Sequence, residues 1–146
     1  MATTYRMKIA VAGAVWFAFV SGASFPLLMQ LFAPASPDPI REAAGALVTF
    51  GLPAGLVAFL LANRLVRSSH LVAMVLGAVL VPIANLLAPV LMGLRGSSLR
   101  SVWAAGVGFI LMDTVFLKGL PFLIGGAAAL IFREAIRRSP GWWEWE

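Results

Sequence analysis

Four long apolar runs constrain this chain more than any other feature of its sequence. They cover residues 9–32, 43–62, 71–94 and 102–132. A helix needs about 20 predominantly apolar residues to cross about 30 Å of hydrocarbon, and each run meets that length. The sequence therefore predicts an all-α integral membrane protein, with four transmembrane helices and a short tail at residues 133–146.

The composition supports the same setting. Hydrophobic residues make up 61% of the chain and charged residues 12%, with a mean hydropathy of +0.94. Soluble domains contain about 45–50% apolar and about 25% charged residues. The net charge of +5 suggests nucleic acid as a partner. However, the basic residues lie at the ends of the apolar runs rather than in one block, so the predicted partner is the lipid bilayer.

Short connections join the four runs, so helices adjacent in sequence are predicted to be antiparallel. The whole chain, residues 1–146, then forms a single four-helix bundle. The first run could also pass for a signal peptide with small residues at 21–23, but its apolar character continues to Phe32, which favours a retained first span. Every run contains proline, which predicts kinks. These prolines are Pro26, Pro53, Pro82, Pro89 and Pro121.

Basic residues predict the orientation, because they accumulate on the cytoplasmic side of membrane helices. Seven are expected on one side of the bundle: Arg6, Lys8, Arg64, Arg67, Arg133, Arg137 and Arg138. Three are expected on the other: Arg41, Arg95 and Arg100. This difference predicts a multi-pass protein of the plasma (inner) membrane with both termini in the cytoplasm. The tryptophans of the tail, residues 141–146, then anchor it at the interface.

Small residues form ridges on three of the predicted helices, and such ridges let membrane helices approach closely. They comprise Ala10, Ala14, Ala18 and Gly22 in the first helix, Gly51 and Gly55 in the second, and Gly125 and Ala129 in the fourth. The ridges either pack the four helices within one chain or join the chain to a second copy or a partner membrane subunit. The sequence leaves both alternatives open.

A short internal repeat is present. The tripeptide Ala-Ala-Gly at residues 43–45 recurs at 104–106, and Gly-Leu-Pro at 51–53 recurs at 119–121. The recurrence predicts two helical hairpins related as parallel repeats, an arrangement found in some transporters. Matches of three residues also arise by chance in a chain rich in alanine, glycine and leucine.

One polar residue from each predicted helix falls at a similar depth. At about 1.5 Å per residue, Ser24, Thr49, Asn85 and Lys118 lie about 20–22 Å from the cytoplasmic end of their helices, and Asp113 lies about 28 Å from it. Intramembrane charges usually face the bundle interior or a wet cavity. These five residues are the predicted binding site, with Lys118 as the cation and Asp113 as its partner. Alternatively, Asp113 lies at the outer interface, Lys118 extends to it, or the two form a structural ion pair.

Several classes of chemistry have no support in the sequence. Cysteine is absent and His70 is the single histidine, so no thiolate site or multi-histidine metal site is expected. No catalytic motif is recognisable, and the chain is predicted to be neither an enzyme nor a binder of cofactors or metals. We expect a small transporter or channel-like homo-oligomer. The alternative is a non-catalytic accessory or assembly subunit of a larger membrane complex, which would dock through the first-helix ridge or the tryptophan tail.

Overall fold

The structure is a computed structural model that describes residues 2–32, 38–93 and 98–139. All regular structure in this part of the chain is helical. The elements are α1 (Ala2–Phe32), α2 (Pro39–Ala46), η1 (Leu47–Gly51), α3 (Leu52–Arg67), α4 (His70–Gly93), α5 (Leu99–Leu111), η2 (Met112–Phe116) and α6 (Leu120–Arg138). The two elements labelled η are single π-helical turns. The tryptophan tail lies outside the described residues.

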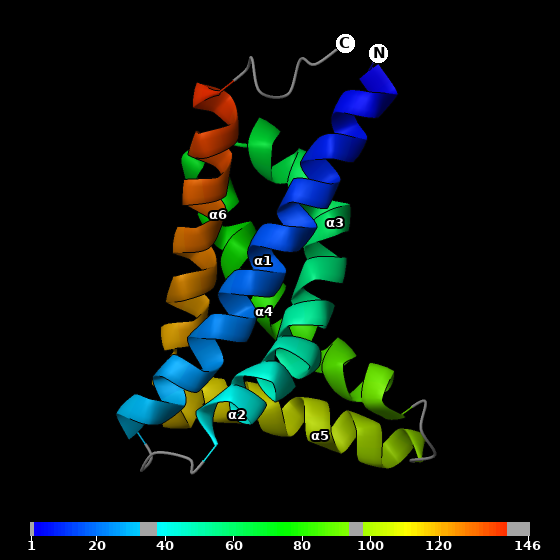
Figure 1. The fold of residues 1–146 in the computed structure, drawn as a ribbon, viewed down its shortest axis with the longest axis vertical. Helices are drawn as coiled ribbons and strands as arrows, with labels where there is room; N and C mark the ends of the chain where they lie inside the picture. Colours follow the sequence, from blue (N-terminus) through cyan, green and yellow to red (C-terminus); the bar gives the residue numbers. More distant parts are fainter. Residues whose placement is uncertain (1, 33–37, 94–97, 140–146) are drawn as a thin grey trace.

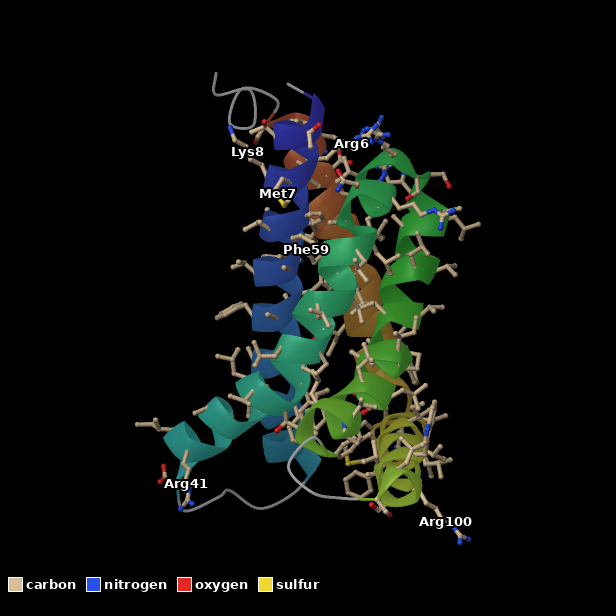
Figure 2. The ribbon with its side chains drawn as sticks, turned by 90° about the vertical axis from the view of Figure 1, so that its right-hand side faces the viewer. Arg6, Met7, Lys8, Arg41, Phe59 and Arg100 are labelled. Carbon is tan, nitrogen blue, oxygen red and sulfur yellow. The ribbon has the colours of Figure 1, made fainter. Side chains whose placement is uncertain are left out.

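Four helices form the body of the molecule. Helices α1, α3, α4 and α6 run roughly along its long axis and pack on one another, so the predicted four-helix bundle is confirmed (Figure 1). Helix α5 lies across one end of this bundle, and the view turned by 90° looks along α5 (Figure 2). We call this the α5 end. The opposite end, where α1 begins and α3 and α6 end, is called the basic end because it carries Arg6, Arg64 and Arg138.

The prediction of one continuous fourth helix over residues 102–132 is wrong. This segment is divided into α5 and α6, because Lys118 and Gly119 have φ angles of 52° and 75°. Consecutive positive φ values do not continue a right-handed helix. The N–H groups of Leu117 and Gly119 donate instead to the carbonyls of Met112 and Asp113, at 3.0 and 2.9 Å, which closes the end of η2.

The prolines have two different roles. Pro26 lies inside α1, and Pro82 and Pro89 lie inside α4, where each removes a backbone hydrogen bond. Pro53 and Pro121 lie in the first turn of α3 and α6. Pro121 follows the break at Lys118 and Gly119, so its position has no intrahelical N–H partner and proline is well tolerated there. Pro53 follows η1 without a break, because Gly51 and Leu52 keep right-handed helical dihedral angles. The prediction of a proline kink within the fourth span is therefore wrong, because Pro121 begins a helix.

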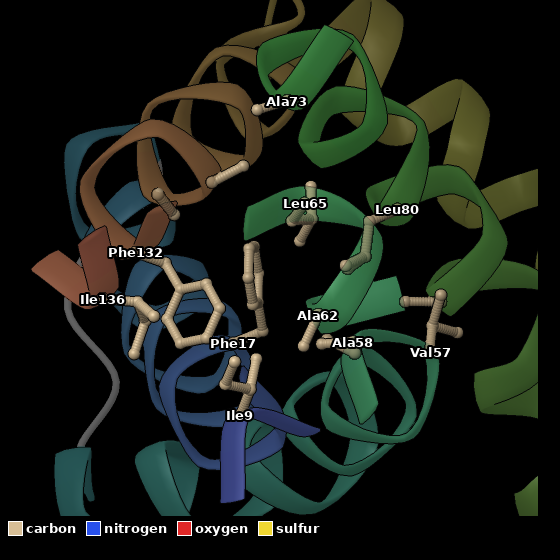
Figure 3. Close-up of a cluster of buried hydrophobic side chains, with 14 residues drawn as sticks. Ile9, Phe17, Val57, Ala58, Ala62, Leu65, Ala73, Leu80, Phe132 and Ile136 are labelled. Atoms are coloured by element: carbon tan, nitrogen blue, oxygen red, sulfur yellow. The ribbon is translucent and has the colours of Figure 1, made fainter. Parts of the chain in front are cut away.

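Small side chains dominate the centre of the bundle (Figure 3). Seven residues of this buried core are alanines: Ala54, Ala58, Ala62, Ala73, Ala84, Ala128 and Ala129. The ring of Phe17 on α1 meets that of Phe132 on α6 edge to face, with centroids 6.1 Å apart. In lipid, close packing of this kind replaces the hydrophobic drive for helix association.

The small-residue ridges are used within the chain. A Cβ on Gly55 would lie 2.8 Å from the Ala14 carbonyl oxygen, so α3 and α1 are in backbone contact there. A Cβ on Gly77 would lie 2.3 Å from the carbonyl oxygen of Gly125, so α4 and α6 are also in backbone contact. These ridges are therefore covered by the chain's own helices, and the expectation that they contact another subunit is not supported.

The outside of the bundle is apolar. Large side chains such as Val15, Phe19, Leu60 and Leu123 are each at least 65% exposed. Four segments of the described chain are long and apolar enough to cross a membrane: Thr3–Leu28, Ala44–Arg67, His70–Leu91 and Leu99–Phe116. The protein is therefore a multi-pass membrane protein whose lateral surface suits lipid.

Candidate functional site

A small cavity lies inside the bundle near the α5 end. Its volume is about 40 Å³, and its walls come from α1, η1, α4, η2 and α6. Most of the lining is apolar or aromatic. The polar lining residues are Ser21, Ser24, Asn85 and Asp113. A water needs at least about 10–15 Å³ on this measure, so the cavity has room for a few waters.

Asp113 and Asn85 are the buried polar pair of this cavity. Each is only 5% exposed, and Asn85 Nδ2 donates a hydrogen bond to Asp113 Oδ2. The bond joins α4 to η2, which are 28 residues apart in the sequence at this point. No ion pair involves the Asp113 carboxylate in the described part of the chain. The carboxyl group therefore has one neutral donor as its protein partner.

The π-helical turn η2 brings Asp113 to this position. Counting along an unbroken fourth helix put Asp113 five residues beyond the level of Asn85. The break after η2 turns α5 across the bundle end and brings the two side chains into contact. π-Helical turns are uncommon and occur frequently at functional sites. The second such turn, η1, contributes Phe50 to the same cavity.

Aromatic rings line one side of the cavity. Phe25 on α1 stacks on Phe50 with the ring centroids 4.2 Å apart. Phe50 in turn meets Phe109 of α5 edge to face, at 5.2 Å. The three rings connect α1, η1 and α5, and Phe25 and Phe50 line the cavity.

Three of the five predicted site residues come together. Ser24, Asn85 and Asp113 line the cavity, and the Ser24 hydroxyl donates to the Ser21 carbonyl at 3.2 Å. Thr49 is partly buried on η1 but is not among the lining residues. Lys118 is exposed at the α5–α6 break and forms no ion pair with Asp113. The structure thus separates Lys118 from its predicted partner, and whether the other three bind a ligand stays a prediction.

A second polar cluster, which the sequence did not indicate, lies at the basic end. The Arg133 side chain is 3% exposed, and its Nε donates to the Ser68 carbonyl at 2.8 Å. Its Nη1 lies 3.1 Å from His70 Nε2 and 3.5 Å from Glu134 Oε2. This cluster ties α6 to the start of α4. Contacts between residues so far apart in the sequence produce no periodic pattern. The one signal in the sequence is that Arg133 directly follows an apolar run.

Glu134 has a further partner on its own helix. The Arg138 Nε donates to Glu134 Oε1 at 2.9 Å. This hydrogen bond, together with the nearby positive charges, lowers the pKa of Glu134 below its usual value. The cluster therefore keeps a carboxylate beside the buried Arg133.

In comparisons with known protein families, characterised proteins and solved structures, nothing matches this chain. Across the described residues, no group of three or more His, Cys, Asp or Glu side chains could hold a metal ion. The functional argument therefore depends on the geometry of the cavity.

Proposed function

We propose that this protein is a small transporter- or channel-like membrane protein, and that the cavity around Asp113 is its site for a small cation. The observation that carries the proposal is a buried carboxyl group facing a cavity inside an apolar bundle. Ionisable residues are costly within membranes and mark ion or substrate pathways there. Asn85 and Ser24 complete the polar wall.

The architecture of the two halves supports a transport role. In the first half, α1 is followed by α2, the π-helical turn η1 and then α3 with Pro53 in its first turn. In the second half, α4 is followed by α5, the π-helical turn η2 and then α6 with Pro121 in its first turn. The sequence repeat at 51–53 and 119–121 falls at the start of the final helix of each half. Transporters are often built from such repeats, with interrupted helices at the binding site.

The size of the cavity limits the ligand. About 40 Å³ admits a few waters or one small ion but no organic solute. Ligand pockets for small organic molecules enclose about 300–1,000 Å³. The transported species is therefore a small ion and not a metabolite.

The proposed setting is the plasma (inner) membrane, with the basic end and both termini in the cytoplasm. In the structure, the seven basic residues predicted for one side lie on segments that meet at the basic end, whereas Arg41 and Arg100 lie at the α5 end (Figure 2). Arg95, the third residue predicted for that end, lies outside the described residues. This separation fits the positive-inside rule. A homo-oligomer is part of the proposal because one bundle of this size leaves little room for a pathway.

Flux into vesicles tests the proposal. Purified protein is reconstituted in phosphatidylcholine vesicles, and uptake of protons, sodium and rubidium is followed with trapped pyranine and with radioactive tracers. We expect Asp113→Asn to reduce the uptake of the transported ion to that of protein-free vesicles. The matched control is Lys118→Met, a charge removal outside the cavity that should leave uptake unchanged.

Two outcomes would contradict the proposal. Uptake no faster than in protein-free vesicles for all three ions would favour the accessory-subunit alternative. Equal uptake by wild type and Asp113→Asn would show that the cavity is not on the route.

A further inference from the structure

We infer that the cation held in this cavity is a proton, bound by the carboxyl group of Asp113 and exchanged with water in the cavity. This inference rests on the proposed function and names its ion. It follows from the atoms that face the cavity, from their number and from the charge they carry.

The cavity offers too few oxygen ligands for a metal cation. Hard cations such as Mg²⁺ and Ca²⁺ take about six or more oxygen ligands. Here the amide of Asn85 presents its N–H group, not its oxygen, to the Asp113 carboxylate. The Ser24 hydroxyl is directed to the Ser21 carbonyl, and the Ser21 side chain is the one further polar group of the lining. The remaining lining side chains are apolar or aromatic. A desolvated metal cation would thus meet one carboxylate, two hydroxyl groups and one amide, which together present fewer oxygen ligands than it requires.

A proton needs no such ligand shell. When it binds, the carboxylate becomes a neutral carboxylic acid, and the cost of an unpaired charge in the membrane disappears. That cost is at least about 2.5–3.5 kcal/mol on insertion scales. No ion pair in the described chain offsets this charge. A proton is therefore the one cation that neutralises the Asp113 carboxylate in this cavity without further oxygen ligands.

The two carboxyl oxygens have different roles in the exchange. Oδ2 accepts from Asn85 Nδ2, and this hydrogen bond can persist in both protonation states. Oδ1 is left to take the proton from a hydronium ion in the cavity, forming the O–H bond and releasing water. A protonated carboxyl group is a donor as well as an acceptor. Water in the cavity is its acceptor, and the reverse step returns the proton to that water.

Infrared spectroscopy of the purified full-length protein tests this inference without requiring transport. Spectra are recorded from acidic to alkaline pH, and the carbonyl stretch of protonated carboxyl groups is followed. We expect a band in wild type that Asp113→Asn removes and Asn85→Leu shifts, because the latter removes the N–H donor to Oδ2. Asp38→Asn is the matched control, since Asp38 is an exposed aspartate at the start of α2 and its loss should leave the band in place.

Sodium competition on the wild-type protein provides the second readout, which does not depend on any variant folding. At constant acidic pH, added sodium chloride should leave the Asp113 band unchanged. Suppression of the band by sodium, or a band that Asp113→Asn does not affect, would overturn the inference. Sodium uptake without a protonated band would overturn it while leaving the transport proposal intact. A band without uptake of any ion would confirm proton binding and contradict transport.

Discussion

The bundle buries one charged group near each end, and the two are held in different ways. At the basic end, the Arg133 guanidinium contacts the Ser68 carbonyl, His70 and the Glu134 carboxylate. At the α5 end, the Asp113 carboxyl has Asn85 as its partner and faces a cavity. Both groups are at most 5% exposed.

The difference separates a structural charge from one that can change its state. A polar network whose members all have partners makes a buried charge rigid and specifies one arrangement of helices. A carboxyl group with one neutral donor and adjacent space can exchange its proton or ligand without breaking helix contacts. The comparison therefore fits a structural role for Arg133 in joining α4 and α6, and it supports the proposed role of Asp113 as the ion-binding group.

The largest effect on stability is expected at the basic end. Arg133→Met should lower the free energy of unfolding by about 1–3 kcal/mol, because it removes the hydrogen bonds that the buried guanidinium makes to the Ser68 carbonyl and to Glu134. Thermal unfolding of the purified protein in detergent measures this loss. Arg137→Met, an exposed arginine on the same helix, is the matched control and should change stability by less than about 0.5 kcal/mol. Equal losses in the two variants would remove the structural role of Arg133.

A smaller effect is expected at the α5 end. Asp113→Asn keeps the shape of the side chain and an oxygen that accepts from Asn85, so the loss should stay below about 1 kcal/mol. The same unfolding measurement checks this value. A loss as large as that of Arg133→Met would make the Asp113–Asn85 pair a structural contact, and the contrast between the two ends would disappear.

The smallest effect concerns the exposed pair Glu134–Arg138. Because the folded state lowers the pKa of Glu134, this group contributes stability above its unfolded pKa, and the contribution is lost as the pH falls through the folded pKa. Arg138→Met should raise the pKa of Glu134 toward its usual value, as followed by carbon NMR of the side-chain carboxyl. The difference in stability between the wild type and Arg138→Met should narrow on acidification. A difference that stays constant with pH would argue against the interaction.

Much of the architecture follows from sequence. The apolar run 71–94 agrees closely with α4, and the run 9–32 lies within α1, which begins earlier at Ala2. The run 43–62 covers the end of α2, η1 and most of α3. The depth estimate places Ser24 and Asn85 at one level. The repeated Gly-Leu-Pro tripeptide marks the start of α3 and of α6. These features are local, and hydropathy or residue spacing reports them directly.

The features that the sequence did not predict depend on backbone dihedral angles and distant contacts. The break at Lys118 and Gly119 falls within the apolar run 102–132, and the depth estimate treated Lys118 as part of a continuous helix. Gly119 and Pro121 also allowed a break at this point, but the sequence alone did not decide between a break and a continuous helix. The Arg133 cluster joins residues up to 65 positions apart. Neither a positive φ angle nor a contact of that range has a periodic signature.

The position of α5 has a consequence for sidedness. By length and hydropathy alone, residues 99–116 could cross the membrane, and the α5–α6 junction would then lie on the same side as Arg6. In the structure this junction lies at the end of the bundle opposite to Arg6 (Figure 1). Because the chain contains no cysteine, a thiol introduced at the junction is the single reactive one in the protein. Labelling of this thiol by a membrane-impermeant maleimide therefore shows which face of the membrane the junction occupies.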